Sequence, residues 1–186
     1  WLASGPRTAN AACMSTLAFA HHYGMGELTL AVFDKHVANP NREVKKEIAS
    51  SLHCLPKEAF QRIWGLASRL IADQDEEVRR AMAFQFCNLE ELPQLLPLAQ
   101  QAAQQDPSAE VRYECIGSMA VMMRPEQAAQ LYGQLLTQDG SNDMAWAVLN
   151  GLRRHAEHPA AKKMLTQLTQ SHYEGVADAA RDALTR

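Results

Sequence analysis

The sequence predicts an all-α fold, an α-α superhelix or solenoid in which about five helix pairs stack along the chain behind one N-terminal helix. Three observations predict it: a polar-to-apolar template that recurs about every 33 residues, an apolar row of helical spacing after each copy, and no strand-like alternation. At 186 residues the chain is long enough to bury a substantial core. We therefore expect one repeat domain over residues 1–186.

The template is a polar capping residue followed five positions later by an apolar residue. Its five copies are Asn39 with Val44, Asp73 with Val78, Asp106 with Val111, Asp139 with Met144, and Ser171 with Val176. We call the apolar members the landmarks; they are 34, 33, 33 and 32 residues apart. A period in this range is typical of arrays in which each unit packs on its neighbours.

Each landmark opens an apolar row. Four positions later stand Ile48, Met82, Cys115, Val148 and Ala180, and eight positions later stand Leu52, Phe86, Met119, Leu152 and Leu184. Apolar residues at positions 0, 4 and 8 share one face of an α-helix, so each landmark predicts a helix with that face buried.

A second helix candidate precedes each landmark helix. Four of these candidates open near a proline, at Pro56, Pro93, Pro125 and Pro159, which suits the first turn of a helix; Pro97 falls inside its helix and should bend or divide it. The predicted pairs are 28–38 with 42–54, 57–71 with 76–88, 91–105 with 108–123, 125–138 with 142–155, and 159–170 with 174–185, so that they span 28–54, 57–88, 91–123, 125–155 and 159–185.

The stretch 8–23 predicts one more helix, with no first-helix partner before it. It is what the second helix of an earlier, partial repeat would look like, and the chain begins at Trp1 rather than at Met. We therefore expect the sequence to be a fragment of a longer protein.

The spacing of Asp73 to Val78-Arg79 and of Asp106 to Val111-Arg112 resembles the HEAT repeat, in particular its short bacterial HEAT-like form of the PBS-lyase type. The resemblance covers about residues 26–186. It implies a solenoid whose second helices line a concave face, with Asp73, Arg79, Asp106 and Arg112 as a structural ladder of ion pairs between and within repeats. Departures at Lys45, Ala145 and Ala177, and at Asn39 and Ser171, predict a ladder that is complete only in the middle.

The composition and the motifs give no support to an enzyme. Four cysteines lie far apart without a C-x-x-C pair, and the histidines His21, His22, His53, His155 and His158 do not have the spacing of a zinc site. The His-Glu dipeptides of the iron-binding HEAT-like hydroxylases are missing, as are a nucleophile elbow and a phosphate-binding glycine loop. We expect no cofactor and no metal.

The formal net charge of -3 argues against a dedicated nucleic-acid or membrane-surface binder. No apolar run approaches the roughly 20 residues that span a bilayer, and no signal-peptide pattern opens the chain. The expected setting is therefore the cytoplasm, and oligomeric state is left open.

The candidate binding surface lies opposite the buried rows. Two residues after successive landmarks stand Lys46, Arg80, Tyr113 and Trp146, and six residues after stand Phe84 and Asn150, with Arg153 nearby. These seven residues, the predicted strip, would form columns on the concave side. Exposed Trp, Tyr and Arg are enriched at binding hot spots, although such rings can also serve only to pack helix on helix.

These observations favour a non-catalytic protein-binding or scaffolding module that recognises another protein or peptide. The alternative is a DNA-binding HEAT-like protein related to the alkylation-repair glycosylases, which Trp146 followed by Asn150 resembles. Asn150 is an amide where such an enzyme needs a carboxylate, and residues 81–151 hold two basic residues against eight acidic ones. A subunit of the phycobilin-attachment type would share the fold but has no specific motif here.

Overall fold

The structure, a computed structural model, describes residues 26–185, which form ten α-helices and no strand. The predicted helix over 8–23 lies outside the described residues. Internal contacts divide the chain into two compact units, residues 1–98 and 99–186, and each is described by itself.

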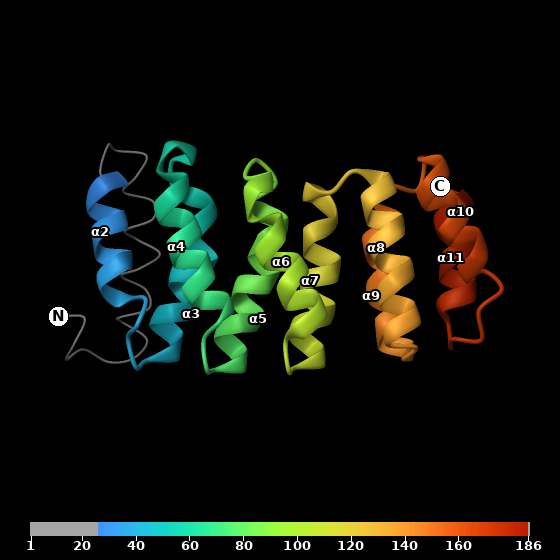
Figure 1. Ribbon diagram of the computed structural model, residues 1–186, viewed down its shortest axis with the longest axis horizontal. Coiled ribbons are helices and arrows are strands. Elements are labelled where there is room, and N and C mark those ends of the chain that lie inside the picture. Colours follow the sequence, from blue (N-terminus) through green and yellow to red (C-terminus); the bar gives the residue numbers. More distant parts are fainter. Residues whose placement is uncertain (1–25, 186) are drawn as a thin grey trace. The chain divides into compact units, whose positions relative to one another are not determined.

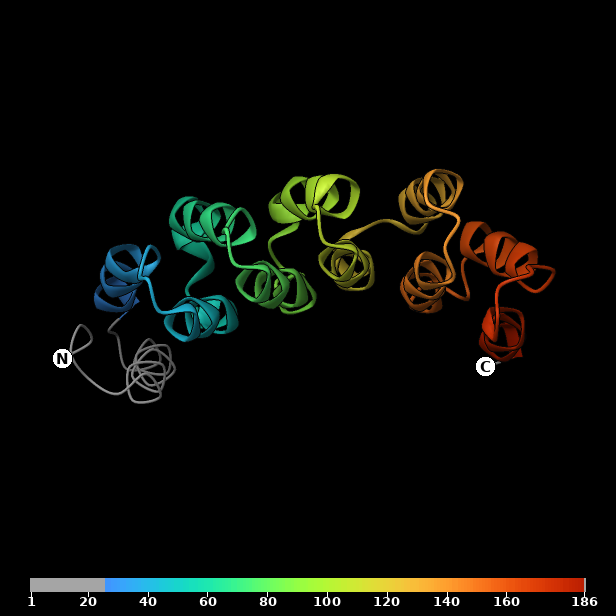
Figure 2. The same ribbon diagram turned by 90° about the horizontal axis from the view of Figure 1, so that it is seen from below.

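The first unit contains two successive helix pairs. Its helices are α2 (Gly26–His36), α3 (Arg42–Ser51), α4 (Phe60–Ile71) and α5 (Glu76–Gln85). The second helices α3 and α5 pack on each other, while α2 and α4 lie together in the other layer (Figures 1 and 2). Arg62 of α4 ties that layer together, because its guanidinium donates to Asp34 at 2.7 and 3.1 Å and to Glu27 at 2.8 Å, both on α2.

The second unit repeats the arrangement. After α6 (Leu96–Gln105), within which the unit boundary falls, come α7 (Ala109–Met119), α8 (Pro125–Gln138), α9 (Asn142–Arg153), α10 (Pro159–Leu168) and α11 (Val176–Thr185). The second helices α7, α9 and α11 pack side by side in one layer, and the first helices α8 and α10 form the other (Figure 2). The fold class is therefore all-α and HEAT-like, as predicted.

The prolines begin helices as expected. Pro125 and Pro159 occupy the first turns of α8 and α10, where a missing N–H leaves no bond unmade. Pro93 opens a 3₁₀ turn at 93–95, and Pro97 is the second residue of α6. The predicted helix over 91–105 is thus divided into a 3₁₀ turn and a shorter α-helix.

The landmark rows form the core. All five landmarks and all five residues four positions later are at most 1% exposed, and four of the five residues eight positions later are fully buried. The exception is Leu184, which is half-buried in the last turn of α11. The predicted buried face is thereby confirmed in every described repeat except for that one position.

A side-chain oxygen closes the connectors before α3, α5, α7 and α9, whereas Ser171 Oγ, in the connector before α11, is buried without a hydrogen-bond partner among residues 26–185. The oxygen Oδ1 of Asn39, Asp73, Asp106 and Asp139 accepts the backbone N–H two residues further on, at 2.8, 2.9, 2.8 and 3.1 Å respectively. The N-cap then follows at once: Asn41, Asp75, Ser108 and Ser141 accept N–H groups of the first turn. Together these bonds fix the residue at which each of these four helices begins.

Cations of the second helices brace the same connectors. Arg79 Nη1 donates to the carbonyl of Asp73 at 2.9 Å, and Arg112 Nη1 donates to the carbonyl of Asp106 at 3.0 Å. Lys45 Nζ binds both carboxylate oxygens of Asp73, at 2.8 and 2.7 Å. A lysine thus makes a contact of the kind that the sequence pattern led us to expect only from an arginine.

Arg112 also reaches forward, since its Nη2 lies 3.4 Å from Asp139 Oδ2 in the next connector. The ion pairs Lys45–Asp73 and Arg112–Asp139 each join a second helix to the carboxylate of the following repeat, while the contacts of Arg79 and Arg112 within a repeat are to a backbone carbonyl. We propose that these side chains, with Lys45 and Asp139 added to the predicted four, stabilise the stacking of repeats.

Gly151 is expected to be intolerant of a side chain. A Cβ at this position in α9 would lie 2.7–2.8 Å from the ring and hydroxyl of buried Tyr132, whose hydroxyl donates to the Ile116 carbonyl at 2.8 Å. Gly151→Ala should lower the free energy of unfolding by about 1–3 kcal/mol in urea titrations. Gly65→Ala in α4 is the matched control: its Cβ would meet nothing within 4 Å, so the variant should be neutral or gain up to about 1 kcal/mol.

Asp106 tests the connector bonds. Asp106→Ala should lower the free energy of unfolding by about 2–3 kcal/mol, because the side chain is buried and accepts the Ser108 N–H. Asp106→Asn keeps that acceptor and should cost less, as measured by denaturant unfolding. Equal losses in the two variants would show that the connector bond contributes nothing.

Asp139 predicts a pH dependence. Hydrogen bonds from Ser141, aided by Arg112, hold the pKa of this carboxyl below its ordinary value despite partial burial. The stabilisation is therefore present above the unfolded pKa of about 3.9 and lost as the pH falls through the lower folded pKa. The stability difference between wild type and Asp139→Asn should be constant above about pH 5 and shrink in acid. A difference that grows in acid would contradict this assignment.

Candidate functional site

A shallow groove of about 370 Å³ lies between α7 and α9 in the second unit. We call it the aromatic groove; its lining residues are Glu110, Tyr113, Glu114, Gly117, Asp143, Trp146, Ala147 and Asn150. In the repeat register these are the positions one before and two, three and six after the landmarks Val111 and Met144. The groove is therefore a direct product of two neighbouring second helices packed in the same register.

Tyr113 is held in place by the following connector. Its hydroxyl lies 3.1 Å from Ser141 Oγ, the N-cap of α9, and the Arg112 guanidinium carbon lies 5.9 Å from the centre of its ring. The side chain is half-buried. The ring is thus fixed by contacts within the unit and still contributes surface to the groove.

Trp146 is positioned in the corresponding way by the connector before α11. A Cβ on Gly175 would lie 3.1 Å from Trp146 Cζ2, so the backbone there approaches the indole closely. Gly175 has φ of +70°, in the left-handed region that favours glycine. Trp146 is half-buried as well, so one part of each ring packs on its own unit and the rest faces the groove.

Three carboxylates surround the two rings. Glu110 and Glu114 come from α7 and Asp143 from α9, and no basic residue lines the groove. In residues 26–185, none of the three forms a hydrogen bond or ion pair through its side chain. Burial raises the pKa of the neighbouring Cys115 thiol, and the charges of Asp106 and Glu114 raise it further. The groove therefore carries uncompensated negative charge.

The structure places the predicted strip in two parts. Tyr113, Trp146 and Asn150 line the aromatic groove, whereas Arg153 is exposed beyond its edge, 3.4 Å from Asn150 Oδ1 and 3.3 Å from the Ala179 carbonyl. Lys46, Arg80 and Phe84 belong to α3 and α5 of the first unit.

These first-unit residues differ in exposure. Lys46 is half-buried and 3.4 Å from Glu43, Arg80 is exposed, and Phe84 is 52% exposed. They occupy the same columns as the rings of the second unit, but with cations at the position two after the landmark. We propose the strip as a set, and of its members Tyr113, Trp146 and Asn150 line the aromatic groove.

The predicted strip lacks five of the eight groove residues: Gly117, which stands in one of its columns, and four that stand outside them, Glu110, Glu114, Asp143 and Ala147. A signal for these four was present, since they stand one before and three after the landmarks and flank the named columns. The prediction considered only the columns two and six after the landmarks, whose residues are mainly aromatic and cationic. When the columns one before and three after the landmarks are added, the surface at the aromatic groove is aromatic and acidic.

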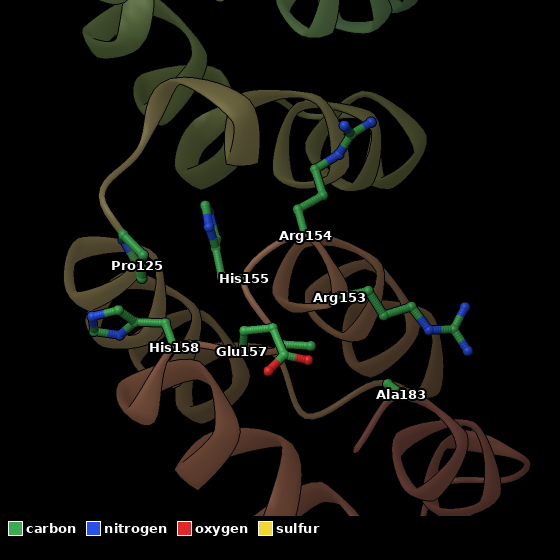
Figure 3. A pocket seen from close by; sticks show the side chains of 8 residues that line it. Pro125, Arg153, Arg154, His155, Glu157, His158 and Ala183 are labelled. Carbon is green, nitrogen blue, oxygen red and sulfur yellow. The ribbon is translucent and has the colours of Figure 1, made fainter. Parts of the chain in front are cut away.

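A larger hollow of about 530 Å³ lies where α9 leads into α10. Its lining is Pro125, Arg153, Arg154, His155, Ala156, Glu157, His158 and Ala183. The side chains do not converge: Arg153 and Arg154 point in different directions, and His158 points away from both (Figure 3).

The histidines of this hollow have structural partners. The Nε2 of His155 donates to the Ala120 carbonyl at 2.9 Å, and His158 caps α10 by accepting the Ala160 N–H at 3.3 Å. His158 Nε2 also lies 3.1 Å from Glu126. Among residues 26–185 no group of three or more His, Cys, Asp or Glu side chains is arranged to hold a metal ion. Within that same range, no helix has both the length and the apolar character needed to cross a membrane.

The comparisons with known proteins agree with this architecture. A family model described as HEAT repeats matches residues 63–138 and 96–185, which together cover more than half of the chain. The crystal structure of an engineered protein from a structural genomics consortium is similar over 99% of this chain and 92% of its own, with 19% sequence identity and a TM-score of 0.56. No curated protein matches the sequence. The buried rows, the capped connectors and the family match together show that the chain belongs to the HEAT-repeat family.

Proposed function

We propose that this chain is a non-catalytic scaffold that binds a segment of another protein in the aromatic groove. The observation that carries the proposal is the pair of half-buried rings, Tyr113 and Trp146, on adjacent second helices, in a groove that Gly117 and Ala147 also line. Small residues beside large rings leave room for side chains of a partner. Aromatic side chains in such a position are the commonest anchors of binding energy at interfaces.

The family supports a binding role. HEAT repeats commonly mediate protein interactions, and the family is generally non-catalytic. A stack of helix pairs buries its landmark rows and leaves the surface columns free to vary. Selection can therefore change the groove without disturbing the core, which is what a recognition module requires.

The charge of the groove favours protein over DNA as the partner. A phosphate backbone would meet Glu110, Glu114 and Asp143 without a cation among the lining residues, and most non-specific DNA affinity comes from cations. Asn150, at the position where the glycosylase resemblance needs a carboxylate, is an amide close to Arg153. A gel shift with duplex DNA at low salt should show no complex, and a salt-dependent one would favour the DNA-binding alternative.

We also propose a bacterial, cytoplasmic setting. The support is the likeness of the repeats to the short bacterial form, and the cysteines Cys54 and Cys115, which are free thiols. Free thiols are typical of a reducing compartment.

Gly117 offers a way to block the groove without damaging the fold. A Cβ at this position would meet nothing within 4 Å, and Gly117 lies inside α7, where a leucine is the better helix former. Gly117→Leu should therefore keep or slightly raise the free energy of unfolding. It should weaken binding of peptides selected on the wild-type chain from a random 12-residue display library by about tenfold or more, a loss of about 1.4 kcal/mol.

Gly65→Leu is the matched control, since Gly65 also lies inside a helix with open space at its Cβ position but outside the aromatic groove. It should leave the affinity of the same peptides unchanged. Peptides that bind Gly117→Leu and wild type equally would show that the groove is not the docking site.

A further inference from the structure

We propose that the segment bound in the aromatic groove is basic, with a lysine or arginine side chain lying across Trp146 between the carboxylates of Glu114 and Asp143. The inference rests on the proposed function and adds to it the chemistry of the partner.

The charge of the groove is the first reason. Three carboxylates line it, no lysine or arginine does, and none of the three has a side-chain partner within the described residues. Structural carboxylates in this protein do have partners: Asp73 is bound by Lys45, and Asp139 by Arg112. Three unpaired acids at one groove repel each other, and a cation supplied by a partner would relieve that repulsion.

The rings are the second reason. The face of an indole or a phenol attracts a cation, and the apolar stem of a lysine or arginine packs well on an aromatic surface. The chain already contains one example, because the Arg112 guanidinium lies 5.9 Å from the centre of the Tyr113 ring. Arg112 is directed to Asp139 and to the Asp106 carbonyl, so it does not neutralise the groove acids.

The charge continues along the second-helix layer of the same unit. The corresponding positions on α11, two and six after the landmark Val176, are Asp178 and Asp182, both exposed. The cation nearest in sequence, Arg181, pairs with Asp178. A basic segment that leaves the groove towards α11 would therefore meet Asp182, in a region that also holds the cations Arg153 and Arg181. An acidic or neutral segment would not gain this attraction.

The test uses the full chain and four fluorescein-labelled 12-residue peptides, in which glycine alternates with lysine, arginine, glutamine or glutamate. Fluorescence anisotropy should show that the lysine and arginine peptides bind at least about tenfold more tightly than the glutamine peptide, and that the glutamate peptide does not bind. Binding should weaken as salt is raised.

Two double variants each remove two negative charges, one from the aromatic groove and the other from a surface outside it. Glu114→Gln with Asp143→Asn should weaken binding of the lysine peptide by about tenfold. The control, Glu126→Gln with Glu157→Gln, removes two exposed carboxylates of the same unit that do not line the groove, and it should change the affinity by less than about twofold. Circular dichroism melting curves check that each variant is folded.

The outcomes separate this inference from the proposed function. Equal losses in the two double variants would overturn the inference, because the attraction would then come from bulk charge. Selection of neutral or acidic library peptides that Gly117→Leu rejects would also overturn it while leaving the docking function in place. If no peptide is sensitive to Gly117→Leu, the proposed function fails as well.

Discussion

The start of four of the five described second helices depends on one short contact, the side-chain oxygen that accepts the backbone N–H two residues further along the connector. It recurs at Asn39, Asp73, Asp106 and Asp139 with nearly constant geometry. Because this contact and the N-cap after it set the first residue of the helix, they also set which residues point into the core. The buried rows, the surface columns and the aromatic groove all follow from that register.

The same connectors also shape the groove. Ser141 is the N-cap of α9 and lies against the Tyr113 hydroxyl, while Gly175, just before α11, lies against the Trp146 ring. Each ring is thus packed at one edge by the connector of the following repeat and open at the other. This explains why both rings are half-buried, because one part of each side chain packs on the protein and another part is available to a partner. Since the rings are already held in place, binding a partner requires little further loss of side-chain entropy.

Periodicity was enough to predict the helices, the buried rows and the role of the prolines. In a repeat array each unit packs only on its neighbours, so the same positions are buried about every 33 residues. It did not predict that Lys45 would bind Asp73, since a family pattern names residue types and not the reach of a side chain. The sequence showed that residues 81–151 are acidic, but it did not predict, for a similar reason, that three of these acids line one groove. Glu110, Glu114 and Asp143 are ordinary surface residues until the packing of α7 on α9 brings them around Trp146.

The central claim is that a basic segment docks between α7 and α9, and nuclear magnetic resonance tests it most directly. In a titration of the labelled chain with the lysine-glycine peptide, the indole N–H of Trp146 and the backbone amides of the groove residues should shift together, while the indole of Trp64 on α4 stays unchanged. Shifts confined to the hollow around Arg153 and His158, or the absence of any shift at Trp146, would contradict the account.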